Sequence, residues 1–302
     1  MVELTGQRVL VTGGAGFIGS HIADVLVADN DVVVLDDLSS GERENVPEEA
    51  TLIEGDVRNL ADLAQAGDVD VIFHEAAVVS VAKSVENPAG CHDVTTDGTI
   101  RVLEFARQQD ARIVTASSAA IYGDPETLPV GEDVPMRPSS PYGVDKLTVD
   151  HYTRLYADLY DLPTVALRYF NVYGPRQSAG DYSGAVSVFR RQAQQGEPLT
   201  VHGDGSQTRD FVHVEDVVRA NLAAATTDAV GEAYNVGTGA ETSVLELAET
   251  IRSVAGSESD IVHEDPRDGD IERSVADISK ARGRLGYEPS VDLETGLGTL
   301  IR

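Results

Sequence analysis

Hydrophobic residues form two patterns that alternate along the first half of the chain. Short runs rich in valine, isoleucine and leucine suit strands that are buried on both faces of a sheet. The segments between them, such as 20–27 and 91–109, repeat apolar residues at helical spacing. This alternation predicts an α/β fold, a Rossmann-like, doubly wound parallel sheet. The predicted strands are residues 8–12, 32–35, 51–54, 69–74, 112–115 and 164–168.

The pattern changes after residue 168, where the chain leaves the predicted sheet layer. Helical spacing returns near 185–195 and near 278–285, the second of which is the last helix expected, and a turn is expected at 201–205. These segments predict a smaller mixed α/β lobe, with a ligand site in the cleft between the two parts. We expect one domain from residues 1–168 and about 207–238, and the lobe from about 169–206 and 239–302.

Charge and cysteine content exclude several classes of partner. The chain has 51 acidic and 23 basic residues and a net charge of −28, so nucleic acid and anionic membranes would be repelled. The acidity is spread along the chain and lysine is scarce, which suggests a halophilic protein with a strongly hydrated surface. The single cysteine, Cys91, predicts a reducing, cytoplasmic location. No metal-ligand spacing and no membrane-spanning run of about 18 apolar residues is present.

A glycine-rich loop follows the first predicted strand. Gly13 and Gly16 would let a pyrophosphate approach the backbone, and Gly19 would let the next helix pack against the strand. We expect Phe17 and Ile18, which lie between Gly16 and Gly19, to bind the cofactor as well. Strand, glycine turn and helix in this order predict a dinucleotide site.

Acidic residues follow the second predicted strand, about 20 residues beyond the glycine loop. Asp36 and Asp37 are placed to hold the ribose hydroxyls of an adenosine and to repel a 2′-phosphate, which favours NAD over NADP. An alternative is that they are ordinary surface acids in an acid-rich protein. Other residues at strand ends should meet the same cofactor: Leu38, Asp56, Val57, Ala76 and Ala77.

Tyr142 precedes Lys146 by four residues, which places a phenol and an ammonium on one helix face. A nearby cation stabilises phenolate, so we expect Lys146 to lower the pKa of Tyr142 and prepare it for acid–base work. The same spacing also occurs on plain solvated helices. Ser118 lies just beyond the end of the fifth predicted strand, at the cofactor edge, which favours chemistry over the solvated alternative.

Nine motifs, in order, resemble the extended short-chain dehydrogenase/reductases, and within them the nucleotide-sugar 4-epimerases. They are TGGAGFIG, LDDLSSG, GDVR, ASSAAIYGD, SPYGVDK, ALRYFNVYGPRQ, GEPLTVHGDGSQTRDFVHVEDVV, YNVGTG and SVADISKARGRLGYEP. The resemblance implies that Tyr142 is the catalytic acid/base, that Lys146 lowers its pKa and holds the nicotinamide ribose, and that Ser118 binds the reacting sugar oxygen. It further implies substrate contacts from Asn171, Arg209, Arg267 and Ser274, and a homodimer formed through the helices of residues 95–109 and 142–156.

Within this family, Ala119 and Ala120 point to epimerisation. Sugar 4,6-dehydratases carry Thr-Asp-Glu after the serine and UDP-glucuronate decarboxylases carry a glutamate in that region, whereas two methyl groups cannot move protons. The small Ser274 predicts tolerance of UDP-GlcNAc and UDP-GalNAc besides UDP-Glc and UDP-Gal. Alternatives are a UDP-uronic acid 4-epimerase, another nucleotide-sugar oxidoreductase, or a non-catalytic NAD-binding regulator.

Three residues depart from the family pattern. Thr95 replaces an amide near the cofactor, and Glu75 replaces an apolar residue between His74 and Ala76. Asp145 stands beside Lys146, where it either raises the pKa of Tyr142 or points to solvent. His74 itself is expected to be a packing residue.

Overall fold

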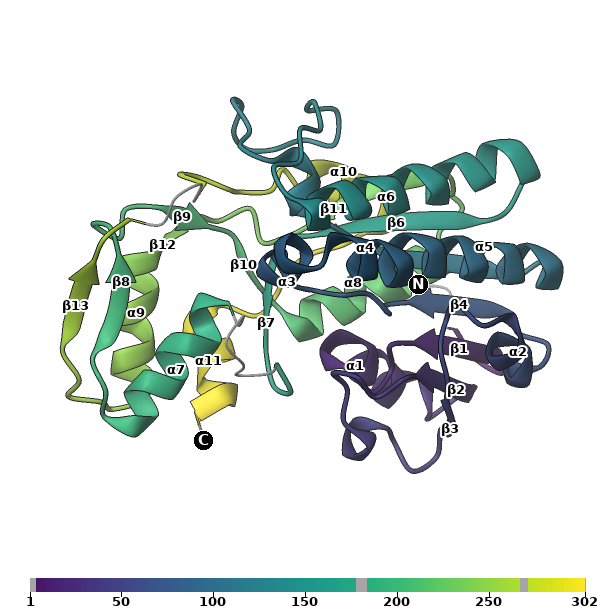
Figure 1. The fold of residues 1–302 in the computed structure, drawn as a ribbon, viewed down its shortest axis with the longest axis horizontal. Helices are drawn as coiled ribbons and strands as arrows, with labels where there is room; N and C mark the ends of the chain where they lie inside the picture. Colours follow the sequence, from purple (N-terminus) through teal and green to yellow (C-terminus); the bar gives the residue numbers. More distant parts are fainter. Residues whose placement is uncertain (1–3, 178–183, 267–270, 302) are drawn as a thin grey trace.

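A seven-stranded sheet forms the larger part of the molecule (Figure 1). The computed structural model describes residues 4–177, 184–266 and 271–301. The strand order is β11-β6-β5-β4-β1-β2-β3, and every neighbouring pair is parallel. This confirms the predicted Rossmann-like sheet. The strands are β1 (Arg8–Thr12), β2 (Asp31–Asp36), β3 (Thr51–Glu54), β4 (Val71–His74), β5 (Arg112–Ser118), β6 (Thr164–Tyr169) and β11 (Glu232–Val236).

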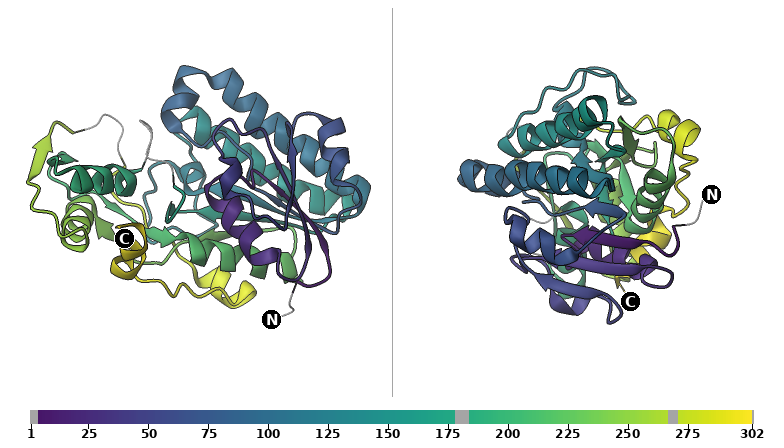
Figure 2. Two further views of the ribbon diagram at one scale, coloured as in Figure 1. Left: turned by 90° about the horizontal axis from the view of Figure 1, so that it is seen from below. Right: turned by 90° about the vertical axis from the view of Figure 1, so that its right-hand side faces the viewer.

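Helices cover both faces of this sheet, as Figures 1 and 2 show. One apolar core lies between the sheet and α1 (Phe17–Leu26), α8 (Val214–Thr226) and α10 (Ser279–Leu285). The other lies under α2 (Leu60–Leu63), α5 (Gly98–Gln109) and α6 (Pro141–Tyr160). Strands buried on both faces explain why the sequence shows continuous apolar runs there. The remaining segments of this part are 3₁₀ turns η1 (Arg43–Asn45), η2 (Ala64–Ala66) and η4 (Ala119–Tyr122), helices α3 (Val81–Glu86) and α4 (Pro88–His92), and the π-helical η3 (Asp93–Asp97).

The register of the sheet brings the candidate site together. Thr12 pairs with Leu35 on one side and with His74 on the other, and Ser118 pairs with Tyr169. Because the strands are parallel, their carboxyl ends meet at one edge. The strand ends of β1, β2, β4, β5 and β6 therefore contribute to one site.

Helix α6 has clear start and stop signals. Ser140 is the N-cap, where its side chain accepts a hydrogen bond from Gly143 N at 3.1 Å, and Pro141 occupies the first turn. The helix ends at Asp161, which has a left-handed backbone with φ 54°. Its buried face carries Lys146 and Asp150, so the helix packs polar groups against the sheet near the candidate site.

The smaller part has its own apolar core, built largely by α7 (Ala185–Gln195), α9 (Val244–Val254), α11 (Leu293–Ile301) and β8 (Leu199–His202) (Figure 2). Two-stranded pairs join β8 to β13 (Ile261–Glu264), β9 (Thr208–Arg209) to β12 (Thr242–Ser243), and β7 (Asn171–Tyr173) to β10 (Phe211–His213). Two expectations are wrong here. Val201 and His202 belong to β8 rather than to a turn, and α11 follows the helix expected to be last. The short helix α11 escaped notice because glycine interrupts its apolar pattern at Gly296 and Gly298.

Across the described part of the chain, none of the helices combines the length and the apolar character needed to cross a membrane.

Candidate active site

The glycine loop after β1 forms a cradle with no room for side chains. Gly13 has φ +70°, and a Cβ on it would lie 2.7 Å from Ala76 N. A Cβ on Gly19 would overlap the carbonyl of Gly13. The first turn of α1, which begins with Phe17 and Ile18, carries no acidic side chain and no side-chain cap. This fits the pyrophosphate of a dinucleotide, which needs close backbone approach and a helix N-terminus.

Asp36 is fixed at the end of β2 by two backbone donors. Its Oδ2 accepts from Ala15 N at 3.0 Å and its Oδ1 from Leu38 N at 2.8 Å, with Leu38 in a left-handed conformation at φ 55°. Burial raises the pKa of Asp36, and the two backbone hydrogen bonds oppose this effect. The held carboxylate is suited to ribose hydroxyls and would repel a 2′-phosphate.

The other predicted cofactor residues lie around the same edge. Asp37 accepts hydrogen bonds from Ser39, and Asp56 forms an ion pair with Arg58. The buried side chain of Val57 occupies the space that a side chain on Gly98 would need. Ala76 and Ala77 follow β4, where Ala76 packs against Gly13. The loop, Asp36 and these strand ends together fit NAD.

Tyr142 and Ser118 lie in hydrogen-bond contact at the mouth of this edge. The Ser118 hydroxyl bonds to the phenol and also accepts from Ala120 N at 3.2 Å, so η4 orients it. Tyr142 N donates to Ser84 Oγ at 3.0 Å, a contact that the sequence did not indicate. Burial raises the pKa of Tyr142, and the Ser118 hydrogen bond partly opposes this. The net lowering of the Tyr142 pKa that was expected from Lys146 is therefore wrong for the protein alone, where burial and Ser118 are the causes that act on the phenol.

Lys146 is buried at 4% exposure, and its Nζ donates to Ala116 O at 2.8 Å. Burial lowers the pKa of Lys146 to about 8, while the charges of Glu75 and Asp145 raise it. Asp145 does not point to solvent: its Oδ1 accepts from Thr96 Oγ1 at 3.2 Å and contacts His92 Nδ1 at 2.6 Å. It acts on Lys146 as a buried anion.

Two adjoining cavities, each of about 230 Å³, open from this edge into the smaller part. The first, which we call the sugar cavity after the substrate that the sequence resemblance implies, is lined by Ser118 and Tyr142 together with Asn171, Arg209 and Ser274. The second holds polar groups of the smaller part, including His202 and Gln207, and shares Asn171 and Arg209 with the first. Arg267 lies outside the described residues. Four residues of the sugar cavity that the sequence analysis did not single out are Tyr122, Tyr169, Phe170 and Ile271.

A family model, the NAD dependent epimerase/dehydratase family, matches residues 9–237. The chain belongs to this family. It is an enzyme of this family with NAD as its cofactor. Its sequence is 43% identical over 298 residues to that of a putative UDP-glucose 4-epimerase of Methanocaldococcus jannaschii, with 97% of each chain covered.

Solved relatives in this family have closely similar folds. The UDP-glucose 4-epimerase of Thermotoga maritima, bound to UDP-glucose, is 38% identical with a TM-score of 0.94 over 97% of each chain. A UDP-N-acetylglucosamine 4-epimerase of Methanobrevibacter ruminantium, bound to UDP-N-acetylmuramic acid, is 35% identical with a TM-score of 0.94, covering 99% of this chain and 98% of the other. More distant ones include a UDP-glucuronic acid 4-epimerase and a dTDP-glucose 4,6-dehydratase, both with NAD bound.

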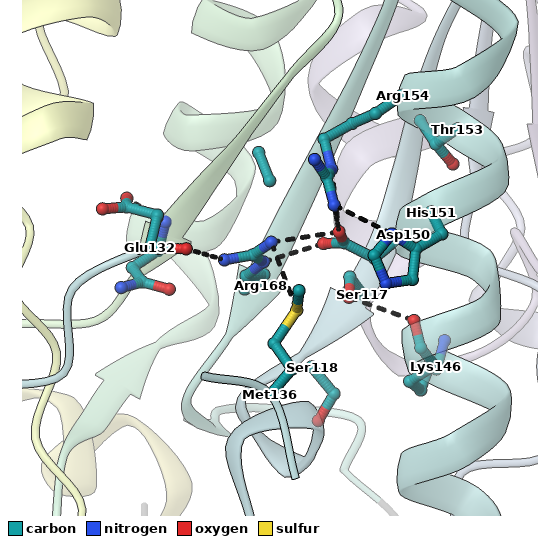
Figure 3. Close-up of polar contacts among 12 residues, drawn as sticks. Ser117, Ser118, Glu132, Met136, Lys146, Asp150, His151, Thr153, Arg154 and Arg168 are labelled. Carbon is teal, nitrogen blue, oxygen red and sulfur yellow. Dashed lines mark hydrogen bonds and ion pairs between the residues drawn. The ribbon is translucent and has the colours of Figure 1, made fainter. Parts of the chain in front are cut away.

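Figure 3 shows a buried polar network around Arg168 and Asp150, and a further member of this network, Tyr122, lines the sugar cavity. Arg168, at 2% exposure, donates from Nε to Asp150 Oδ2 at 2.7 Å and from Nη1 to Tyr122 OH at 2.8 Å. Tyr122 OH in turn donates to Asn235 Oδ1 at 2.7 Å. Because Tyr122 lines the cavity, the network holds one of its walls in place.

Three other polar residues near the site make hydrogen bonds within the protein: His74, Asp210 and Thr95. His74 bonds to Thr12 Oγ1 at 2.7 Å and to Thr99 Oγ1 at 2.9 Å, and burial lowers its pKa to about 3, so it stays neutral. Asp210 accepts from the backbone of Gly239 at 2.9 Å and of Ala276 at 3.1 Å, which ties the cavity wall near Ser274 to the sheet. Thr95 accepts from Val78 N at 3.2 Å inside the π-helical turn.

Proposed function

We propose that the protein is an NAD-dependent UDP-hexose 4-epimerase that interconverts UDP-Glc and UDP-Gal, and UDP-GlcNAc and UDP-GalNAc. The observation that carries this proposal is the wall of the sugar cavity next to Ser118 and Tyr142. Ala119 and Ala120 form that wall, and the cavity lining has no carboxylate among the described residues. Elimination of water needs an additional acid and base, so this cavity favours epimerisation.

The site residues have distinct proposed roles. Tyr142 as phenolate takes the proton of the sugar's 4-hydroxyl, and Ser118 holds the same oxygen. NAD, when bound, supplies the chemistry of accepting a hydride from carbon 4 and of giving it back to that carbon. Because the 4-keto sugar turns over within the cavity, carbon 4 would present its opposite face to the returning hydride, and Tyr142 gives its proton back to the 4-oxygen. Gly13, Gly16, Gly19, Asp36 and Lys146 would hold the cofactor, and no net redox change results.

The nucleotide part of the substrate has a proposed place in the second cavity. Asn171 and Arg209 belong to both cavities, so they sit where a diphosphate would link sugar and uridine. A guanidinium suits phosphate oxygens. Arg209 is the one cationic residue among the described residues that line the sugar cavity, and its assignment to phosphate leaves no cation for a uronate carboxylate. This favours UDP-hexoses over UDP-uronic acids.

We also propose that the protein is a cytoplasmic homodimer. Exposed apolar residues form a stripe on α6 with Val144, Leu155 and Leu159, and Val81 and Val85 are exposed on the adjacent α3. A second copy of the chain could cover this stripe by packing its own α6 against it. Cys91 is a buried free thiol, which suits a reducing compartment. The sedimentation coefficient of the wild-type protein and a Leu159→Glu variant tests the dimer; unchanged association in the variant would contradict it.

The function is tested by incubating the purified protein with UDP-Glc, UDP-GlcNAc and UDP-GlcA. Mass spectrometry and NMR should show 4-epimers of the first two, with unchanged mass and no stoichiometric NADH. A Tyr142→Phe variant should retain NAD but lose turnover by roughly 10²–10⁴-fold. Product that has lost water, or NADH formed in proportion to product, would contradict the proposal. Undiminished turnover in Tyr142→Phe would remove the mechanism.

A further inference from the structure

Glu75 is a carboxylic acid beside the cofactor edge that is held by a hydrogen-bonded tyrosine. It lies between His74 and Ala76, at the point where the backbone packs against Gly13. Its Oε1 accepts a hydrogen bond from Tyr169 OH at 2.8 Å. Asn221 Nδ2 donates to that same Tyr169 oxygen at 2.8 Å, so α8 and β6 both fix the arrangement. A carboxylate anchored this way has a defined position rather than a mobile one.

Lys146 is a buried cation close to the position of Glu75. Its Nζ donates to Ala116 O in β5, and Glu75 follows β4, which pairs with β5 so that His74 lies opposite Thr115. A buried ammonium is costly unless its charge is compensated. Glu75 and then Asp145 are the two carboxylates whose charges act on Lys146. Asp145 also contacts His92 and accepts a hydrogen bond from Thr96. For Glu75, the one side-chain hydrogen bond within the described residues comes from Tyr169. Of the two carboxylates, the charge of Glu75 has the larger effect on Lys146.

We propose that Glu75 is a positioning residue for Lys146: its carboxylate, fixed by Tyr169, balances the buried ammonium and thereby sets the pH range in which Tyr142 and Lys146 work. The inference rests on the proposed function only where the test measures turnover of UDP-glucose. It does not require Glu75 to touch the sugar. The acid–base step stays with Tyr142.

The other titratable groups around Glu75 give the sign of the effect. His74 is neutral, Tyr169 remains a phenol because burial raises its pKa, and the charge of Asp145 also acts on Lys146. Burial raises the pKa of Glu75 to about 7, opposed by the Tyr169 hydrogen bond and by Lys146. Removing this anion makes the site more positive. Both Tyr142 and Lys146 should then lose their protons at lower pH.

Glu75→Gln removes the charge while keeping the size and an acceptor for Tyr169. Its matched control is Glu104→Gln, because Glu104 accepts from Tyr156 OH at 2.7 Å in a comparable Tyr–Glu pair that does not act on Lys146. The first measurement needs no sugar. The ultraviolet absorbance of tyrosinate is measured against pH in the NAD-loaded wild type, Glu75→Gln and Glu104→Gln proteins. Each titration is repeated with Tyr142→Phe added to the same protein. The difference between the two curves is the titration of Tyr142 alone.

The Tyr142 titration should move to lower pH by about one unit in Glu75→Gln, and should not move in Glu104→Gln. With UDP-glucose, both limbs of the kcat/KM pH profile should move the same way. If Glu75→Gln fails to fold, Tyr169→Phe serves instead: it leaves the carboxylate without its donor, and a smaller shift in the same direction is expected. If Glu75→Gln lowers the stability or the NAD content of the protein but does not shift the Tyr142 titration, Glu75 is a structural residue only and the inference is overturned. Absence of epimerase activity in every protein defeats the proposed function, while the titration still decides this inference.

Discussion

Lys146 Nζ and Ala116 O are joined by a 2.8 Å hydrogen bond that fixes α6 to the carboxyl-terminal part of β5. The strand ends two residues later at Ser118, so this bond sets the distance between the serine and the helix that carries Tyr142. It aligns the two parts of the candidate active site that come from distant segments of the chain.

A pH dependence follows from the state of Lys146. Its pKa is lowered to about 8, chiefly by burial, so the ammonium is present below that pH and is lost above it. We expect kcat/KM to fall as the pH rises through about 8. Lys146→Met should reduce kcat by roughly 10²-fold or more and remove this limb. A profile that stays flat to pH 10 in the wild type, measured with UDP-glucose, would contradict the assignment.

Ser274 should control the size of the accepted sugar. It lines the same cavity as Ser118 and Tyr142, so a bulky side chain there narrows the space for an N-acetyl group. Ser274→Tyr should lower kcat/KM for UDP-GlcNAc by roughly 10–200-fold, while that for UDP-glucose changes little. Ser274→Ala is the matched control and should keep both substrates. Undiminished UDP-GlcNAc turnover in Ser274→Tyr would show that this wall does not set the specificity.

The Asp150–Arg168 pair should be a major determinant of stability. Asp150 is fully buried, and although burial opposes its ionisation, Arg168 and Arg154 hold its pKa below the usual value. The stabilisation is present above the pKa of the unfolded carboxyl and is lost as the pH falls through the folded value. Asp150→Asn should lower the free energy of unfolding by about 3–5 kcal/mol in urea titrations at pH 7.

Glu288→Gln is the surface control for that experiment, because Glu288 and Arg282 form an exposed pair. It should cost less than about 1 kcal/mol. Equal losses in the two variants would mean that the buried network around Arg168 and Asp150 does not depend on the Asp150 charge.

The acidic surface predicts a response to salt. A net charge of −28 repels itself in dilute buffer, and salt screens this repulsion. We expect the melting temperature to rise from low to multimolar KCl. A protein that is most stable without salt would disprove adaptation to a saline cytoplasm.

Several features could be derived from the sequence because they depend on residues close together in the chain. The strand–glycine–helix order at Gly13 to Gly19 and the acid at Asp36 belong to one short unit, and the structure forms it as expected. Continuous apolar runs gave the parallel strands, because strands buried on both faces need no polar alternation.

Only the tertiary structure decided how distant charges balance one another. Asp145 and Lys146 are neighbours in sequence, yet Asp145 turns to His92 on another helix. Glu75 meets Tyr169, 94 residues away, through strand register that no local pattern encodes. Burial likewise reversed the direction expected for the pKa of Tyr142. Local spacing fixes which side chains share a helix face, whereas desolvation and counter-charge depend on which segments pack around them.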